Sequence, residues 1–406
     1  MKVLIYAHDW APSIGGIETV TMVLALGLAN WKATDDGETI EVTLVTQTAA
    51  NGMDDLALPF RVVRQSSQRG LAKLVRSADI IHIANPAFMP LFFGWWFRKP
   101  TVLEHDGYQS ICPNGLLVHE PDRSVCPGHF MAGRYGKCVR CNSARLGWLK
   151  SLRSLLLTFP RRWLSRRVAR NIAPTNHVGR RVALPRTQIM YHGVPNLAPP
   201  RPVNRTEGDQ TLPCFAYVGR LVMEKGVPVL LLASKKLSQK GYSFLLRIVG
   251  DGSERLKLEQ MTEALGLRGR TEFVGAVRAD AVAGLLLHAT AVVMPSVWED
   301  VAPLAASELL MQGHVIIASD IGGLGEIVDG AALKFPPGDS DALESCMRQV
   351  LDNPKMASEL RLKARQRGIE VFSAKRMVEE HALLYRTLEG SAGYAGRASK
   401  TRRAQP

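Results

Sequence analysis

The residues best suited to chemistry lie in the second half of this 406-residue chain. Arg220 and Lys225 lie five positions apart in the segment Gly219–Gly226 (GRLVMEKG), directly after an apolar run that predicts a strand. Open α/β sheets bind their ligands at the carboxyl ends of parallel strands. Two cations there can neutralise a diphosphate on which charge builds as a bond breaks. Taken alone, the pair fits two solvated surface cations equally well.

Two carboxylates follow a later predicted strand, in PSVWEDVAPLAASE (residues 295–308). Seven residues separate Asp300 from Glu308, and Glu299 precedes the first of them. We expect Asp300 in a loop and Glu308 about one turn into a helix that begins near Pro303. A carboxylate there can accept hydrogen bonds from two ribose hydroxyls, unless both acids only complement the helix dipole. The amides expected to hold phosphate or sugar oxygens are those of Val301, Ala302 and Leu304.

Short glycine-containing segments follow three other predicted strands. They are Ser13–Glu18 (SIGGIE, with Gly15 and Gly16), Ile248–Gly252 (IVGDG, with Gly250) and Asp320–Glu326 (DIGGLGE). Glycine lets the backbone approach a ligand or make a tight turn. Such a segment is often only a turn, and IVGDG lacks the full dinucleotide fingerprint, so a dehydrogenase is poorly supported.

These segments need elements to position them, and the chain supplies strands that alternate with helices in both halves. The pattern predicts an α/β protein with parallel sheets. The predicted strands are Lys2–Tyr6, Glu41–Thr46, Ile80–Ile83, Thr101–Glu104, Phe215–Gly219, Leu245–Val249, Thr271–Val274, Ala291–Met294 and Val315–Ala318. A boundary is expected in residues 195–212, where Pro195, Pro199, Pro200, Pro202 and Asn204 indicate a linker.

In this order, the segments resemble the retaining GT-B glycosyltransferases of family 4, over nearly the whole chain and most strongly over Val218–Val328. The family signatures Gly-Arg-Leu…Glu-Lys-Gly, Val-Gly-Asp-Gly, Glu-x7-Glu and Gly-Gly-x-Pro-Glu have counterparts here. The resemblance implies two Rossmann-like domains facing across a cleft. They would span residues 1–200 and 205–375, with a closing helix at 376–388 that returns to the first domain. We expect residues 389–406 to be disordered.

The same resemblance assigns roles to residues. Arg220 and Lys225 would grip the diphosphate, Glu308 the ribose and Asp300 the donor sugar. His105, in LEHDGY, would lie against that sugar, whereas Gly15, Gly16, Gly219 and Gly250 would let the backbone approach the donor. No protein nucleophile and no catalytic cofactor are implied.

Four departures concern the donor sugar more than the reaction class. Asp300 replaces the usual first Glu, so Glu299 in a shifted register is an alternative sugar contact. Val301-Ala302-Pro303 replaces the common Pro-Phe-Gly, and Gly325 and His314 each stand where the family usually has Pro.

Four of the six cysteines lie in one segment near residues 110–145, after His105. Cys112, Cys126, Cys138 and Cys141 are separated by 13, 11 and 2 residues, and the last two form Cys-x2-Cys. This predicts a structural zinc site, with an iron–sulfur cluster or free thiols as alternatives. We expect the loop to shape acceptor selection. Cys214 and Cys346 lie in apolar surroundings typical of structural residues.

The net charge of +14 comes from one segment. From Arg123 to Arg205 there are 17 Lys or Arg residues and no Asp or Glu. Within it, residues 145–182 mix arginines with Trp and Leu, and we expect Pro160 to divide them into two helices. A basic amphipathic helix on an anionic membrane and a packed helix with a solvated arginine face both fit.

Residues 1–12 do not resemble a signal peptide, and the apolar run Pro86–Phe97 is too short to span a bilayer. We therefore expect a cytoplasmic enzyme, peripheral on the inner face of the plasma membrane. It would move sugar from a UDP- or GDP-type donor to a glycan or lipid-pyrophosphate acceptor, in cell-surface polysaccharide or lipopolysaccharide synthesis. A nucleotide-sugar epimerase is one alternative. A basic metal-knuckle protein that binds nucleic acid is another, but no aromatic stacking positions are evident, so no nucleic-acid partner is expected.

Overall fold

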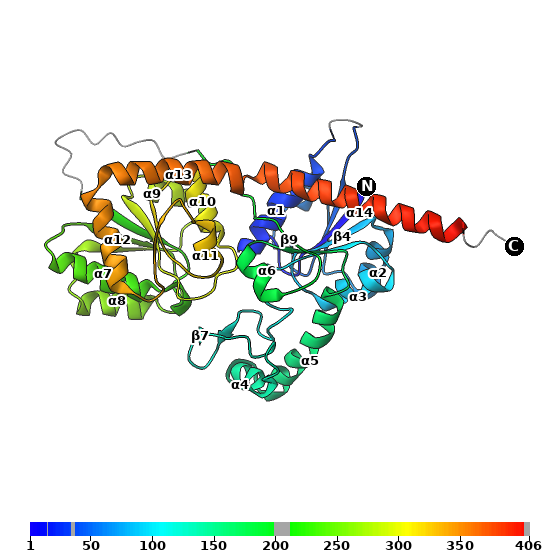
Figure 1. Cartoon of the computed structure of the whole chain (residues 1–406), viewed down its shortest axis with the longest axis horizontal. Coiled ribbons are helices and arrows are strands. Elements are labelled where there is room, and N and C mark those ends of the chain that lie inside the picture. The colour runs from blue at the N-terminus through cyan, green and yellow to red at the C-terminus, as the bar shows by residue number, and fades with distance from the viewer. Residues whose placement is uncertain (14, 34–36, 199–211, 402–406) are drawn as a thin grey trace. The chain divides into compact units, whose positions relative to one another are not determined.

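The computed structural model describes residues 1–13, 15–33, 37–198 and 212–401, apart from the side chains of residues 279 and 391–401. Ile14 of the first glycine segment, the linker residues Pro199, Pro200, Pro202 and Asn204, and the last five residues of the predicted tail therefore lie outside it. The chain forms two compact units (Figure 1). Unit 1 combines Met1–Gly193 with the C-terminal segment from Ala374, and unit 2 is Val194–Ser373.

Unit 1 is built on a seven-stranded parallel sheet with strand order β3-β2-β1-β4-β5-β8-β9. Its central strands β4 and β5 are buried along their whole length, as their apolar sequences require. The strands are β1 (Lys2–Tyr6), β2 (Glu41–Thr46), β3 (Arg61–Arg64), β4 (Ile80–Ile83), β5 (Thr101–Glu104), β8 (Arg170–Ala173) and β9 (Thr187–Ile189). The helices are α1 (Gly16–Ala29), α2 (Gln68–Ser77), α3 (Phe88–Trp96), α4 (Tyr135–Leu146), α5 (Trp148–Ser165), α6 (Asn176–Val182) and α14 (Ala374–Thr401).

Between β5 and α4 the chain forms an extra lobe that contains the four clustered cysteines. Its only regular pairing among the described residues is the short antiparallel ladder of β6 (Val118–His119) with β7 (Ser124–Val125). Helix α4 carries the Cys-x2-Cys pair and packs against α5.

Unit 2 has a six-stranded parallel sheet with the order β12-β11-β10-β13-β14-β15. Its strands are β10 (Cys214–Val218), β11 (Leu245–Val249), β12 (Thr271–Gly275), β13 (Ala291–Met294), β14 (Ile316–Ser319) and β15 (Leu333–Phe335). Its helices are α7 (Val227–Gln239), α8 (Arg255–Ala264), α9 (Ala279–Leu286), α10 (Leu304–Gln312), α11 (Gly322–Ile327), α12 (Ser340–Asp352) and α13 (Pro354–Phe372). Helices α7, α8 and α12 pack together over a core of leucine, valine and phenylalanine. The two parallel sheets confirm the predicted α/β class.

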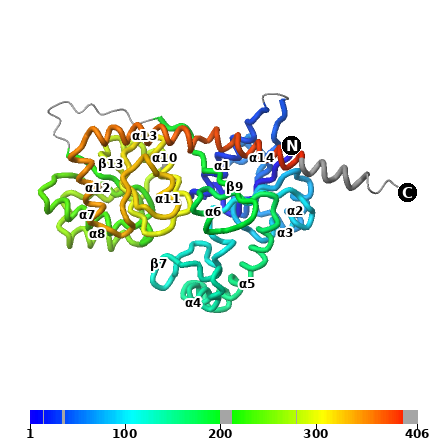
Figure 2. The backbone as a smooth tube through the Cα atoms, viewed as in Figure 1, coloured from blue at the N-terminus to red at the C-terminus, as the bar shows by residue number. Residues whose placement is uncertain are grey.

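The chain leaves unit 2 after α13 and returns to unit 1 as α14, which packs against α1 and β4 (Figure 2). The predicted disordered tail differs from the structure, because α14 continues to Thr401. Residues 390–401 contain three Ala, one Arg and one Lys, which favour helix, and three Gly, which oppose it. The segment extends a helix already formed on unit 1.

The predicted break at Pro160 is wrong, since α5 runs unbroken from Trp148 to Ser165 with Pro160 inside it. Proline removes one backbone donor from a helix, and packing of α5 on α3 and α4 offsets that loss. Among the described residues, no helix is both long and apolar enough to cross a membrane.

Candidate donor-binding site

The candidate site of unit 2 lies where its sheet changes direction. The chain runs outward from β10 to β12 and then crosses back to β13 on the other side of β10. Open α/β sheets bind ligands beside the carboxyl ends of the two strands at such a switch point. The segments that follow β10 and β13 contain Arg220, Lys225 and Asp300, as the sequence predicts.

Glycines bring the loops of this edge into backbone contact. A Cβ atom on Gly226, whose φ is 67°, would lie 1.9 Å from the Pro295 carbonyl oxygen. A Cβ atom on Gly250, with φ of 136°, would lie equally close to the Gly219 carbonyl oxygen. Side chains at these positions would force the loops after β10, β11 and β13 apart, so the glycines set the shape of the site.

An ion pair joins the two central loops. Lys225 Nζ donates to Asp300 Oδ1 at 2.7 Å and Oδ2 at 3.0 Å, and Ser296 Oγ donates to Oδ2 at 2.7 Å. Asp300 is buried, whereas 21% of the Lys225 side chain is exposed. The ammonium group has three donors, so it can hold Asp300 and still meet an anion from solvent.

Two charged groups beside this pair have no such partner. Glu308, half-buried in α10, makes no ion pair or side-chain hydrogen bond with any described residue, and burial raises its pKa above the usual value. Arg220 is exposed, and its side chain has no hydrogen bond or ion pair with any described residue, whereas its backbone oxygen accepts from the Tyr217 hydroxyl at 2.8 Å and the Val222 amide at 3.1 Å. These two side chains and the remaining donor of Lys225 can therefore form further hydrogen bonds at this edge.

The remaining predicted donor-binding residues lie along the same edge. The loop after β13 also contacts the start of α11, where Gly323 N donates to the Asp300 carbonyl oxygen at 2.7 Å. The edge includes Gly219, Gly250, Glu299, Val301, Ala302 and Leu304, the last being the first residue of α10.

The predicted site residues of unit 1 lie at the start of a helix and at the end of a buried strand. Gly15 and Gly16 lie at the start of α1, which has no side-chain cap. His105 follows β5 and is fully buried. Its Nε2–H donates at 2.9 Å to Asn171 Oδ1, because the amide nitrogen of Asn171 already donates to two backbone carbonyls. Burial lowers the pKa of His105 to about 4, so the ring is neutral at pH 7.

A buried polar chain surrounds the end of β5, and the sequence reasoning missed it. Tyr385 of α14 lies 2.8 Å from His82 Nδ1, and His82 Nε2 lies 3.1 Å from Glu104 Oε2. His192 Nε2 lies 3.4 Å from Glu104 and 2.8 Å from Asp106. A histidine inside IIHI and a glutamate ending TVLE were the available signals, since buried charges need partners.

The charged groups of this hydrogen-bonded cluster are buried, and each changes the pKa of its neighbours. Burial raises the pKa of Glu104, but hydrogen bonds with His192 and His82 outweigh it and hold that pKa well below its usual range. Burial lowers the pKa of His192, but the Asp106 carboxylate raises it, with Glu104, to about 10. Burial raises the pKa of Asp106.

Two groups of described residues have ligand atoms close enough to hold a metal ion. In His82–Glu104–His381 and in Glu104–Asp106–His192 these atoms all lie within 4.8 Å of one another. Both ring nitrogens of His82 already have hydrogen-bond partners, however, so the first group lacks a free lone pair. The cluster is best described as a hydrogen-bonded chain that attaches α14 to β4 and β5.

The four lobe cysteines are buried, but they are not among the described groups whose ligand atoms all lie within 4.8 Å. They share one neighbourhood, since burial, together with the other three thiols, raises the pKa of Cys138 to about 12. Donors point at two of the sulfurs. The Glu120 amide donates to Cys141 Sγ at 3.3 Å, and the amides of Leu117, Asn114 and Gly115 surround Cys112.

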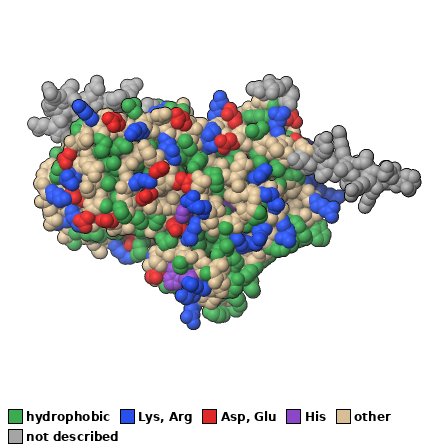
Figure 3. Space-filling model, in the orientation of Figure 1, with side chains coloured by type: hydrophobic (Ala, Val, Ile, Leu, Met, Phe, Trp, Pro, Cys, Tyr) green, Lys and Arg blue, Asp and Glu red, His purple; other side chains and the backbone are tan. Residues whose placement is uncertain are grey.

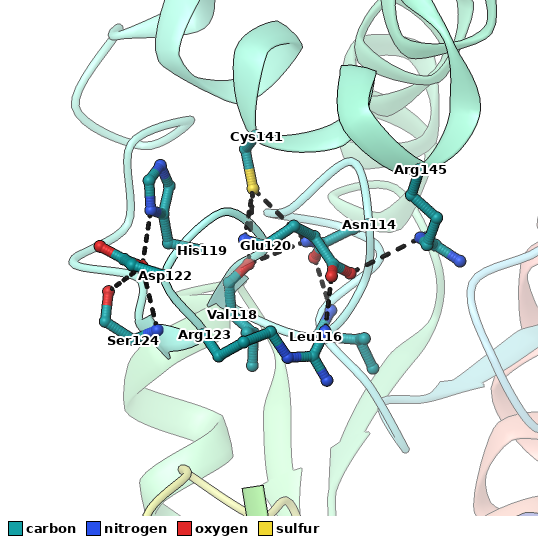
Figure 4. Close-up of polar contacts among 10 residues, drawn as sticks. All are labelled: Asn114, Leu116, Val118, His119, Glu120, Asp122, Arg123, Ser124, Cys141 and Arg145. Atoms are coloured by element: carbon teal, nitrogen blue, oxygen red, sulfur yellow. Dashed lines mark hydrogen bonds and ion pairs between the residues drawn. The ribbon is translucent and has the colours of Figure 1, made fainter. Parts of the chain in front are cut away.

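Figure 4 shows the polar contacts that hold the Cys141 side of this lobe. Glu120 lies between two cations, 2.5 Å from Arg123 and 3.6 Å from Arg145. Asp122 accepts hydrogen bonds from His119 and Ser124, which fixes the β6–β7 turn. Polar contacts therefore hold the Cys141 side of the lobe, and a small apolar cluster of Phe130, Cys138, Val139 and Leu155 joins the lobe to α5.

Comparison with known proteins places this geometry in a class. HepE from Anabaena in complex with UDP superposes with a TM-score of 0.70 at 17% identity, covering 95% of this chain and 100% of that one. Sucrose-phosphate synthase from Thermosynechococcus elongatus gives 0.68 at 18% identity, covering 96% and 99%. The fold is thus that of the GT-B glycosyltransferases.

The family comparison then identifies the domain that holds the site. Residues 203–367 match the family described as Glycosyl transferases group 1, so the chain contains a glycosyltransferase group 1 domain. The chain is 26% identical over 178 residues to alpha-D-kanosaminyltransferase of Streptomyces kanamyceticus, covering 43% of this chain and 46% of that protein. It is 33% identical over 171 residues to glycogen synthase of Mycobacterium tuberculosis, covering 42% and 41%. The match spans less than half the length of either relative.

Proposed function

We propose that the protein is a retaining glycosyltransferase that binds a nucleotide-diphosphate sugar at the carboxyl edge of unit 2. The observation that carries the proposal is the Lys225–Asp300 pair across the switch point, beside the unpartnered Arg220. A ligand that satisfies this edge needs an anionic group for the cations and hydroxyls for the free carboxylate. A nucleotide sugar has both.

In this proposal Arg220 and Lys225 bind the diphosphate, and the start of α10 adds oriented amides. The bond between the anomeric carbon and the diphosphate oxygen breaks, and its electron pair goes to the diphosphate. The two cations neutralise that charge. The acceptor hydroxyl forms the new bond to the anomeric carbon and passes its proton to the departing diphosphate, so no protein nucleophile is involved.

The other predicted site residues orient the donor. Glu308 accepts hydrogen bonds from the ribose hydroxyls, which relieves a desolvated carboxylate. Asp300, held by Lys225, contacts the donor sugar, with Glu299 as the alternative. His105 is neutral and buried, so we give it a positioning role rather than a proton-transfer role.

UDP is the first donor nucleotide to test, because HepE was solved with UDP, and GDP is the second. We propose a glycan or lipid-pyrophosphate acceptor in cell-surface polysaccharide or lipopolysaccharide synthesis. An enzyme at the cytoplasmic side of an anionic membrane would meet such a lipid. The basic segment from Arg123 to Arg205 supports this placement.

A structural zinc ion is proposed for the four lobe cysteines. Burial raises the pKa of Cys112, Cys138 and Cys141, so these crowded cysteines would ionise only beside a bound cation. The amides aimed at Cys112 and Cys141 would then stabilise the thiolates. Elemental analysis should find about one zinc per chain, and chelation should lower Tm. A metal-free protein whose Tm is unaffected by a chelator would remove the zinc proposal and leave free thiols.

Thermal-shift and calorimetric titrations with UDP, GDP, ADP and their sugar conjugates test the donor site. A nucleotide at 100 times its Kd should add about 2.7 kcal/mol of stability. Lys225→Ala and Glu308→Ala should lose that gain. Lys236→Ala, which removes a lysine paired with Asp341 away from the site, should keep it. If no nucleotide stabilises the wild type, the transferase proposal fails.

A further inference from the structure

Helix α5 exposes an apolar face to solvent. Six large side chains, here called the α5 stripe, are between 39% and 80% exposed: Trp148, Leu149, Leu152, Leu156, Phe159 and Trp163. At about 100° per residue they fall within an arc of roughly 100°, so they form one continuous row about 22 Å long.

The buried side of α5 consists of two leucines, Leu155 and Leu164, and three small polar residues. Ser151, Thr158 and Ser165 are fully buried, and each hydroxyl donates to a carbonyl four residues earlier in the helix, at 2.8, 2.9 and 2.8 Å. A surface helix of a globular protein normally has the reverse pattern, with its large apolar residues inside. The exposed stripe is therefore unexplained by packing within the chain, and such patches mark interaction sites.

Helix α3 extends this surface. Trp95 and Trp96 are exposed, and the Trp95 ring lies edge-on to Trp163 at 5.3 Å between centroids. Tyr135 of α4 continues the row, 5.1 Å from Phe159. Figure 3 shows hydrophobic side chains gathered along the edge of unit 1 where Figure 1 places α3 and α5. Three helices thus contribute to one surface rich in tryptophan.

Cations accompany the apolar residues. Arg153 is exposed on α5 beside the stripe, and no acidic residue occurs between Arg123 and Arg205. A groove of about 740 Å³ between α3 and α5 has Arg98 and Arg167 among its lining residues. Arg167 stacks over Trp163 at 3.5 Å, and the Arg98 guanidinium has no ion pair with any described residue.

Arg98 occupies a costly position. It follows α3 with φ of 53°, the left-handed conformation that usually belongs to glycine after a helix. This conformation places an exposed cation among the residues that line the groove. A phosphate-bearing ligand would explain the residue where packing does not.

We propose that the α3–α5 surface docks on an anionic phospholipid bilayer, with the α5 stripe in the headgroup region and Arg98 at a lipid phosphate. Tryptophans and leucines flanked by cations suit that interface. A second copy of the chain suits it less, because two acid-free basic surfaces would repel. The inference rests on the proposed function in one respect: a lipid-linked acceptor would be the reason for the enzyme to bind a membrane.

Flotation of the full-length protein with vesicles tests the surface. Phosphatidylcholine vesicles that contain phosphatidylglycerol should bind the protein, and phosphatidylcholine alone should bind it far less. Replacing Arg98 and Arg153 with Gln should weaken binding about 25-fold, since each cation near an anionic surface contributes about fivefold. The stripe variant Trp148→Gln, Leu149→Gln, Leu156→Gln should weaken binding at least as much.

A matched control replaces Leu256, Leu362 and Leu383 with Gln, three leucines outside α3 and α5 whose exposure of 67% to 73% lies within the 59% to 80% of the altered stripe residues. This control should float like the wild type. Wild-type protein that ignores the anionic vesicles, or a stripe variant that floats unchanged, would overturn the proposal. A lipid-independent dimer that the stripe variant abolishes would also overturn it.

The nucleotide thermal shift, measured on the same preparations, separates the two proposals. A stripe variant that keeps the nucleotide shift but no longer floats supports the docking surface and shows an intact fold. Wild-type protein that floats without any nucleotide shift retains the surface and loses the donor site.

Discussion

Both sheets place charged residues at the carboxyl ends of their central strands, but the two units use them differently. In unit 1, Glu104, Asp106 and His192 are buried and bound to one another. In unit 2, Asp300 is bound by a partly exposed lysine, and Glu308 and Arg220 lack partners among the described residues. The difference suggests a rule. A charged group whose partners all lie within the protein stabilises the fold, whereas a charged group without such a partner is available to bind a ligand.

Glu104→Gln should have the largest effect on stability. It removes the carboxylate that faces His192 and His82, and breaking a buried pair costs about 3–5 kcal/mol. Chemical denaturation measures the loss, and the exposed pair Arg247–Glu272 supplies the control Glu272→Gln, which should cost less than about 1 kcal/mol. Equal costs for the two variants would refute the rule for unit 1.

The pH dependence of the wild type follows from the same network. The lowered pKa of Glu104 stabilises the fold above the ordinary value of 4.5, and this contribution is lost in acid. The raised pKa of His192 stabilises it fully below 6.5 and not at all above about pH 10. Asp106, with a raised pKa, opposes the first trend. Glu104→Gln should flatten the acid side of the stability profile.

The Lys225–Asp300 pair should show an intermediate effect. Lys225→Ala leaves the buried Asp300 carboxylate with only Ser296 as a side-chain partner among the described residues. The double variant Lys225→Ala, Asp300→Ala should therefore lose less stability than the sum of the losses in the two single variants. A coupling of about 1–3 kcal/mol is expected in a double-mutant cycle. Additive effects would mean that the pair does not connect the two loops.

Glu308→Gln should reverse the sign seen with Glu104. The neutral amide replaces a desolvated carboxylate, so the free energy of unfolding at pH 7 should increase by at most about 1 kcal/mol, and Tm should rise with it. Nucleotide affinity should fall about tenfold or more, because hydrogen bonds to a charged acceptor are lost. A fall in both quantities would make Glu308 a structural residue.

Arg98→Gly should give the smallest change. Relief of the left-handed strain, about 1–2 kcal/mol, should exceed the entropic cost of introducing glycine, about 0.5–1 kcal/mol, so stability should rise slightly. Binding to anionic vesicles should weaken about fivefold. Lower stability, measured by thermal unfolding, would show that packing retains the arginine.

How far the sequence predicts this molecule depends on the distance between partners. Strands such as Lys2–Tyr6 and Ile80–Ile83 are placed to the residue, because a buried apolar run is a local signal. The glycine loops and Glu308 also follow from short motifs. The contact between His82 and Tyr385 spans 303 positions, and that between Lys225 and Asp300 spans 75, so no local pattern contains either. The predicted helix break at Pro160 is wrong because packing of α5 against other helices offsets the free-energy cost of a proline inside a helix.

The return of α14 to unit 1 has a consequence for synthesis on the ribosome. Tyr385, which completes the hydrogen-bonded chain to His82 and Glu104, is translated only after the whole of unit 2. Unit 1 begins first but cannot be completed until unit 2 has emerged. At about 5–20 residues per second, its exposed β4 and β5 would wait roughly 10–40 s for their cover. During this interval the nascent chain depends on chaperones, and release before Ala374 would free an unfinished sheet.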